Sequence, residues 1–295
     1  MLRERQQQLI QILYDTGHFE NPENPTGVLE NELQFLTIND EPVKIAVRSY
    51  QNFFNDQYHT LTSGIGIADG ELNPATVKLL ELPRCSVSDF VSSGVGSWPK
   101  NCNGTGHAIT VRVSKAGMPS FLSSSFEQAW DLCAASYDNM GLRLIREDTN
   151  DNANILMSFE RLRGSTIGLA IVGRNQTCRT SIWAKFSPTY NPKDRINQWA
   201  RLLSHELGHN MGMGHSRGGI MNPSIVSGPY TGTQWRGDPN ESILRRYFGG
   251  IPNTPPTPEP EPPKGPNDEW WQGSLNRMRG DEIIESFILI PRPKV

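Results

Sequence analysis

Apolar residues recur at intervals of three and four over roughly the first 80 residues. This spacing puts them on one face of a helix. It predicts a helix that ends near Gly17, a second that Pro42 opens and that runs to Phe54, and a short third that begins at Pro74. Together they predict a small three-helix module, which we bound at residues 1–85.

A different pattern follows residues 86–97, which are small and polar and indicate a flexible connector. Alternating or β-rich apolar runs predict strands, and apolar residues at helical spacing predict helices. Strands are predicted at 107–113, 153–159, 167–173 and 180–186, and helices at 123–141, from 194 into 212, and at 240–248. This α+β pattern indicates a second domain over residues 98–250.

The helix predicted at 123–141 leads to two further expectations. Ser124 and Glu127 have the spacing of a capping box. Cys133 falls on the apolar face and is expected in the core. The two other cysteines outside the N-terminal module, Cys102 and Cys178, could form a disulfide, although the sequence does not prove it.

A proline-rich segment follows the second domain. Residues 251–266 hold eight prolines in sixteen positions, which is typical of an extended, semi-rigid linker. We bound the linker at 251–267. The tail at 268–295 is too short for a core of its own, so it docks on this chain, docks on a partner, or stays loose.

Composition excludes several function classes. The formal net charge of −3 gives no indication of binding to nucleic acid or to an anionic membrane. No stretch is apolar enough for a membrane span, and the N-terminus lacks the apolar run of a signal peptide. Either a signal has been removed, export uses another route, or the protein acts where it is made.

The chemistry is concentrated in residues 205–215, "HELGHNMGMGH", which hold three of the six histidines. His205 and His209 are four apart and share one helix face, so both imidazoles can bind one Zn²⁺. Gly212 tolerates the backbone angles of a sharp helix exit. The chain can then return His215 as the third ligand. His18, His59 and His107 are isolated and are interpreted as ordinary residues.

Three neutral histidines leave one zinc position open for a water, whose pKa falls to about 7. Glu206 adjoins the first ligand and can take the proton of that water and later deliver it to a leaving amine. The motif therefore predicts a zinc-dependent endopeptidase that hydrolyses protein or peptide substrates with one catalytic zinc.

With these residues the chain resembles the metzincin metallopeptidases and, among them, the matrix metalloproteinases (matrixins). Met221 in "GGIMNPS" matches their methionine turn, and "DGELNPATVKLLELPRC" resembles the end of their peptidoglycan-binding-like propeptide. The resemblance implies a twisted, mostly parallel sheet with an antiparallel edge strand, an active-site helix, the Met-turn and a C-terminal helix. It also implies a propeptide at 1–85.

The resemblance gives Cys85 a role. Matrixin propeptides end in a segment whose cysteine thiolate occupies the fourth zinc position and keeps the enzyme latent. Pro83, Arg84, Cys85 and Asp89 match that segment, and Arg84 and Asp89 could pair to hold it. Ser86 replaces a family glycine, which would strain the latch if the glycine conformation disfavours other residues. Ser88 replaces a second family residue, a proline.

In that family an extended peptide pairs with an edge strand above the zinc. The resemblance makes Leu169, Ala170 and Ile171 the candidate edge, and Pro223 and Ile225 the candidate wall of the pocket. Residues 160–193 contain neither His nor Asp, so the structural zinc and the calcium sites of matrixins lack their usual ligands there. One zinc is expected, and calcium elsewhere stays open.

Two other functions remain open. The chain could be a binding or structural component of an envelope or virus particle, with a partner for its tail. It could instead hydrolyse the peptide bridges of peptidoglycan. Retention of Glu206 favours an enzyme, and attachment of Cys85 to the helical module favours a propeptide. The expected location is extracellular, in a cell envelope, or on a virion.

Overall fold

The structure is a computed structural model of the 295-residue chain and divides it into two compact units, residues 1–251 and 252–295. It describes residues 2–57, 68–91, 98, 107–173, 176–179, 181–216, 218–225, 228–248, 274–279 and 282–288. The proline-rich linker, residues 92–97 of the predicted connector, His59 and Cys102 lie outside the described residues.

The N-terminal module contains the three predicted helices, and their buried residues form a hydrophobic cluster of their own. Gly17, at φ 84°, follows the first helix, and the Asn73 side chain accepts a hydrogen bond from the Thr76 amide to cap the third. Two 3₁₀ helices, η1 and η2, were not predicted. The elements are α1 (Arg3–Asp15), η1 (His18–Glu20), η2 (Glu30–Phe35), α2 (Glu41–Gln57) and α3 (Pro74–Leu80).

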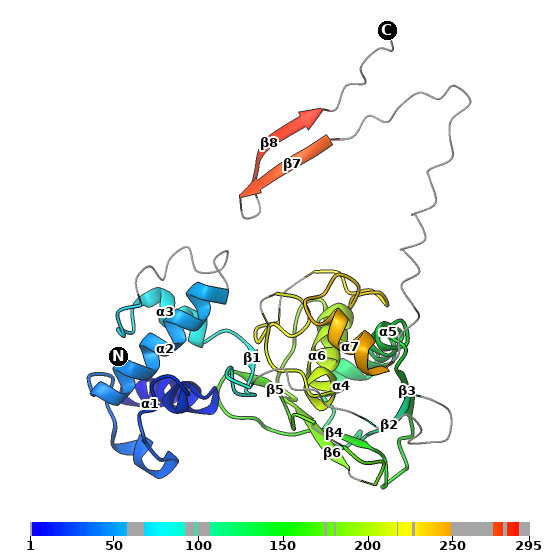
Figure 1. Cartoon of the computed structure of the whole chain (residues 1–295), viewed down its shortest axis with the longest axis horizontal. Coiled ribbons are helices and arrows are strands. Elements are labelled where there is room, and N and C mark those ends of the chain that lie inside the picture. Colours follow the sequence, from blue (N-terminus) through cyan, green and yellow to red (C-terminus); the bar gives the residue numbers. More distant parts are fainter. Residues whose placement is uncertain are drawn as a thin grey trace. The chain divides into compact units, whose positions relative to one another are not determined.

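The second region is built on a six-stranded sheet with the order β1-β5-β6-β4-β2-β3 (Figure 1). Only the β5–β6 pair is antiparallel, which confirms the predicted mostly parallel sheet with one antiparallel strand. That strand, β5, is not at the edge of the sheet as predicted, because β1 pairs with its other side. Strands β1 and β3 were not predicted. The strands are β1 (Arg84–Cys85), β2 (Ala108–Val113), β3 (Arg143–Arg146), β4 (Ile155–Phe159), β5 (Thr166–Ala170) and β6 (Ile182–Phe186).

The helices of this region are α4 (Ser120–Ser123), α5 (Phe126–Asp138), α6 (Arg195–Asn210) and α7 (Glu241–Phe248). The helix predicted at 123–141 is confirmed as α5, but the predicted start and the capping box are wrong. The chain turns between α4 and α5, and Ser125 takes the cap position without a side-chain bond. Glu127 pairs with Arg146 of β3 instead, because a guanidinium is a stronger partner for a carboxylate than a cap amide.

Helices α5 and α6 lie side by side, and their facing residues fill the core. Trp199 of α6 is fully buried, and its ring contacts Phe159, Phe186 and Tyr190. Cys133 is free and fully buried, as predicted. Every residue of α6 from Trp199 to Asn210 is buried, so its C-terminal half carries its polar side chains into the interior.

The second unit contains an antiparallel pair, β7 (Ser274–Arg279) and β8 (Glu282–Ile288). The predicted tail therefore includes a hairpin, which the sequence pattern did not indicate. Among the described residues, no helix combines the length and apolar character needed to cross a membrane.

The packing of Trp199 gives a stability prediction. Trp199→Ala should lower the free energy of unfolding by about 3–5 kcal/mol, because it removes a large buried ring and leaves a cavity. Phe35→Ala is the matched control, since Phe35 is an aromatic residue that is 75% exposed. Urea unfolding followed by tryptophan fluorescence and circular dichroism measures both. Equal losses in the two variants would contradict the assignment of Trp199 to the core.

Candidate metal centre

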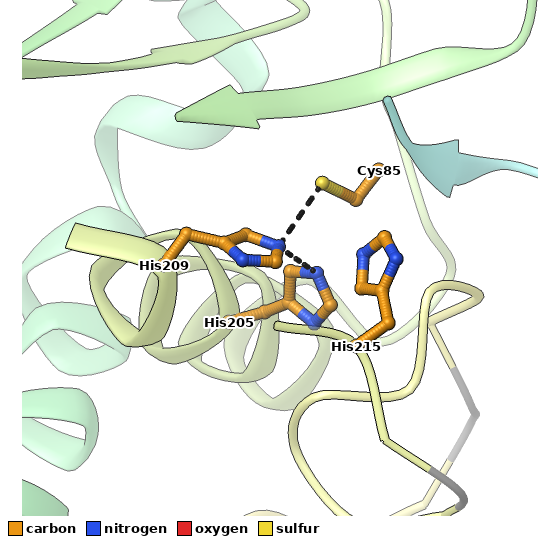
Figure 2. A group of neighbouring side chains, drawn as sticks. All are labelled: Cys85, His205, His209 and His215. Carbon is orange, nitrogen blue, oxygen red and sulfur yellow. Dashed lines mark hydrogen bonds between the residues drawn. The ribbon is translucent and has the colours of Figure 1, made fainter. Parts of the chain in front are cut away.

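Helix α6 carries His205 and His209 one turn apart, and the chain leaves the helix at Gly212, which has φ 93°. This exit returns His215 to the same place, as the sequence predicts. Figure 2 shows the three imidazoles facing Cys85, which comes from β1. The ligand atoms of these four residues all lie within 4.8 Å of one another.

Each imidazole is held by a hydrogen bond at Nδ1. The acceptors are the Ile220 carbonyl for His205 (2.8 Å), the Met213 carbonyl for His209 (2.7 Å) and a carboxylate oxygen of Asp89 for His215 (2.8 Å). Because these acceptors carry no proton, Nδ1 is the protonated nitrogen, and each Nε2 presents a lone pair to the cluster. The buried Nε2 of His215 has no hydrogen-bond partner among the described residues.

The cluster fits one zinc ion. In a tetrahedral site, two ligand nitrogens lie about 3.3 Å apart, and a nitrogen and a sulfur about 3.6 Å apart. The observed separations are 3.1 Å between the Nε2 atoms of His205 and His209, and 3.4 Å from His209 Nε2 to Cys85 Sγ. Burial lowers the pKa of His205 to about 3 and also lowers that of His209 and His215. The imidazoles are therefore neutral, as metal ligands must be.

Cys85 reaches the cluster because β1 pairs in parallel with β5. The Cys85 amide donates to the Pro223 carbonyl at 2.9 Å, and the Ser86 amide donates to the Gly168 carbonyl at 3.2 Å. The thiol is fully buried, and burial together with the Glu206 carboxylate raises its pKa. A divalent cation in the cluster would have the opposite effect and favour the thiolate.

Residues after Cys85 are packed as well. The Ser86 hydroxyl hydrogen-bonds with Thr166 Oγ1, and Val87 and Asp89 are buried. Residues 86–91, the described part of the predicted connector at 86–97, are therefore buried or half-buried rather than exposed.

Arg84 and Asp89 pair, as predicted. Arg84 Nη2 lies 2.6 and 2.8 Å from the two carboxylate oxygens, and both residues are buried. Asp89 also bonds to His18 Nε2 at 3.0 Å. His18 is not part of the metal cluster, but it is a buried partner of Asp89, a contact that the sequence analysis did not predict. No local pattern could reveal a contact between residues 71 positions apart.

Glu206 is fully buried beside the cluster, with Oε2 3.6 Å from Cys85 Sγ. Burial raises its pKa to about 8. The carboxylate fits because residue 168 of the neighbouring strand is glycine. A Cβ at Gly168 would lie 2.1 Å from Glu206 Oε1. Sequence reasoning missed Gly168, although it precedes the candidate edge residues directly.

Met221 is fully buried against the underside of α6. A Cβ at Gly208 would lie 2.3 Å from its sulfur, so the thioether packs between the turns that carry His205 and His209. Asp238 stabilises the chain turn that contains Met221, because its carboxylate accepts a hydrogen bond from the Ile220 amide at 2.7 Å. Sequence reasoning missed Asp238, because its partner is a backbone amide and leaves no residue pattern.

The remaining candidate residues are placed around the site. Ala170 is buried in β5 and Leu169 is half-buried, while the Ile171 carbonyl accepts from the Asn210 side chain at 2.9 Å. The Pro223 carbonyl binds the Cys85 amide directly. Ile225 lines a groove of about 630 Å³ that also touches Pro83, Thr166, Ile167 and Tyr190. Their contacts with a substrate stay predictions.

Known proteins resemble the region that carries this centre. Residues 108–216 match the model of the M12B reprolysin-like metallo-peptidase family. Two zinc metalloproteinase-disintegrin-like proteins of Naja atra are similar: atragin, 34% identical over 76 residues, and a kaouthiagin-like protein, 35% identical over 74 residues. These matches cover 26% and 25% of this chain, which spans only 12% of the length of each relative.

Two solved structures of myroilysin are also similar, with TM-scores of 0.30 and 0.31 and sequence identities of 16% and 17%. The similar regions make up 42% and 45% of this chain, and 47% and 52% of the two myroilysin chains. Over these residues the chain is therefore similar to zinc metallopeptidases, and its cluster of one cysteine and three histidines could hold one metal ion. These similarities do not single out the matrixins.

The cluster predicts the metal content. The purified full-length chain should hold about one zinc per molecule, and His209→Ala should lose it, because one of two adjacent helix ligands is removed. His107→Ala is the control, since His107 lies outside the cluster. Native mass spectrometry measures the stoichiometry. Two tightly held zinc ions in the wild type would contradict the expectation of a single site.

The contact at Gly168 gives a second prediction. Gly168→Ala should displace the Glu206 carboxylate and lower stability by about 1–3 kcal/mol, as overpacking of a filled interior does. Thermal unfolding and zinc content are measured together. The zinc should remain, because the atoms nearest to the added methyl group belong to Glu206 and not to a histidine. Wild-type stability in this variant would show that the interior has room for the extra methyl group.

Proposed function

We propose that the chain is a zinc-dependent endopeptidase of protein or peptide substrates that is kept latent by its own N-terminal module. The observation that carries the proposal is the convergence of Cys85, His205, His209 and His215 on one point. Three of these residues come from the metallopeptidase region, and the fourth comes from the end of the helical module. Metal binding and inhibition would therefore use one cluster.

In this proposal His205, His209 and His215 hold the zinc, and Glu206 is the general base. A bound zinc supplies Lewis acidity toward a substrate carbonyl and lowers the pKa of water. Glu206 accepts the proton of the attacking water and delivers it to the leaving amine. Its position supports this role, because Glu206 adjoins the first ligand on α6 and its Oε2 reaches the cluster, 3.6 Å from Cys85 Sγ. Met221 and Gly208 hold the helix turns that carry the ligands.

The latch would act by occupying the substrate site. Because β1 adds to β5 through backbone hydrogen bonds, the same edge could receive an extended peptide once β1 has left. Leu169, Ala170 and Ile171 would continue that edge, with Pro223 and Ile225 on the other side of the cleft. The thiolate of Cys85 would fill the fourth zinc position while the latch is closed.

The segment from Pro83 to Asp89 supports a latch of the matrixin type, whereas the matching family model is reprolysin-like. We therefore propose a metzincin domain with a matrixin-like propeptide at 1–85 and a catalytic domain at 98–250. An extracellular location agrees with Cys178, which is disulfide-bonded, because disulfides persist in oxidising compartments.

The role of Glu206 is tested by Glu206→Gln. The amide has the same size but cannot accept a proton, so peptidase activity should fall by about 10²–10⁴-fold while zinc is retained. Casein hydrolysis is measured on proteins activated in the same way. Glu160→Gln, on the surface beside Lys185, is the control. Activity within threefold of wild type would show that another group is the base.

The latch is tested by Cys85→Ser in the full-length chain. Activity should rise about tenfold or more. Each 1.4 kcal/mol of metal–thiolate binding free energy that is lost raises the ratio of open to closed latch about tenfold. Cys133→Ser is a matched control at the other free, buried cysteine. Cleavage within 86–97 should activate the wild type in the same way. Equal activity of wild type, Cys85→Ser and cleaved protein would refute latency.

A further inference from the structure

The carboxylate of Asp89 is the point where the helical module, the latch and the metal centre meet. Its oxygens accept hydrogen bonds from His18 Nε2 at 3.0 Å, from Arg84 Nη2 at 2.6 and 2.8 Å, and from His215 Nδ1 at 2.8 Å. Its own amide donates to the Thr16 carbonyl at 3.0 Å. Burial opposes ionisation, but the charge of Arg84 and these bonds hold the pKa of Asp89 well below its usual range.

The bond from His18 is fixed by the core of the module. The Asp89 carboxylate can only accept from His18 Nε2, so His18 Nδ1 accepts the proton of the Ser49 hydroxyl at 3.0 Å, and Asn21 donates to the oxygen of that hydroxyl at 2.9 Å. The proton of the neutral imidazole is therefore on Nε2, which points to Asp89. His18 is fully buried between the rings of Tyr50 and Phe90. The module thus holds Asp89 with a rigid donor.

The three histidines of the metal centre differ in where their Nδ1 acceptors come from. His205 and His209 donate to the carbonyls of Ile220 and Met213, both in the metallopeptidase region. His215 donates to Asp89, four residues after Cys85 in the latch segment. When the latch leaves, two of the three imidazoles keep the acceptors described here, and the third loses its carboxylate.

We propose that Asp89 is a positioning residue for the third zinc ligand, supplied by the propeptide. In the latent chain its carboxylate fixes the tautomer and ring orientation of His215 and makes Nε2 a stronger donor. Release of the latch then withdraws two groups from the metal, the Cys85 thiolate and the carboxylate behind His215. The propeptide thereby aids zinc loading and retention as well as blocking the cleft. This inference rests on the proposed zinc site.

The test compares zinc affinity in full-length chains that lack the thiol. Cys85→Ala and the double variant Cys85→Ala/Asp89→Asn are titrated with zinc against a competing chelator. Loss of the carboxylate should weaken zinc binding by about 10–100-fold, the usual effect of removing an outer partner of a ligating histidine. Equal affinities would overturn the inference. Absence of zinc binding in the wild-type chain would instead refute the proposed function itself.

A second readout separates positioning from a general loosening of the latch. Buried, hydrogen-bonded imidazole N–H protons exchange slowly, and proton NMR of the zinc-loaded chain should show one for each of the three ligands. Among the three ligand resonances, Asp89→Asn should shift or abolish only that of His215, assigned with His215→Gln; the His18 resonance also changes, because His18 is another donor to Asp89. A change in all three ligand resonances, or in none of them, would overturn the inference.

A third variant covers a failure of Asp89→Asn to fold. Asp89→Glu keeps the charge for Arg84 and His18 and moves the carboxylate by one methylene. This variant should retain the His205 and His209 resonances and shift that of His215. It should weaken zinc binding less than Asp89→Asn does, because the charge is kept. An unshifted His215 resonance in this variant would also overturn the inference.

Discussion

The centre depends on one constraint, which is that three buried imidazoles must each have a fixed acceptor at Nδ1. A buried ring without one would lose a hydrogen bond and could rotate away from the cluster. The exit at Gly212 brings His215 into reach, Asp238 holds the peptide whose carbonyl anchors His205, and the turn after α6 supplies the carbonyl for His209. Most of the surrounding architecture can be traced to these three requirements.

The N-terminal module meets the centre through backbone and side-chain contacts that reinforce each other. Strand β1 fixes the position of Cys85 along β5, while the Arg84–Asp89 pair fixes the loop that follows. A buried charge pair is costly to desolvate, and it persists here because His18 and His215 complete the hydrogen bonding of the carboxylate. The segment around Cys85 is therefore held on both sides of the cysteine, and the Ser86 hydroxyl hydrogen-bonds with Thr166.

The sequence predicted what depends on local spacing. The stretch at 194–215 was enough to predict helix α6, its two histidines and the exit at Gly212. The pairing of Arg84 with Asp89 could be predicted in the same way, because the two residues are only five positions apart. Strands β1 and β3 were missed because they are two and four residues long. The contacts of Asp89 with His18 and His215 span 71 and 126 positions, so only the folded chain brings them together. The predicted capping box is absent because the Glu127 carboxylate pairs with Arg146, which lies 19 positions further along the chain.

Strand β1 has a consequence for solubility. While it is paired, β5 has a neighbour on each side, but after its departure β5 lies at the rim of the sheet with unpaired amides and carbonyls. Such a row is a template for strands of other molecules and promotes aggregation. If the module is released as proposed, the freed chain would expose this edge and would be expected to self-associate more readily as its concentration rises.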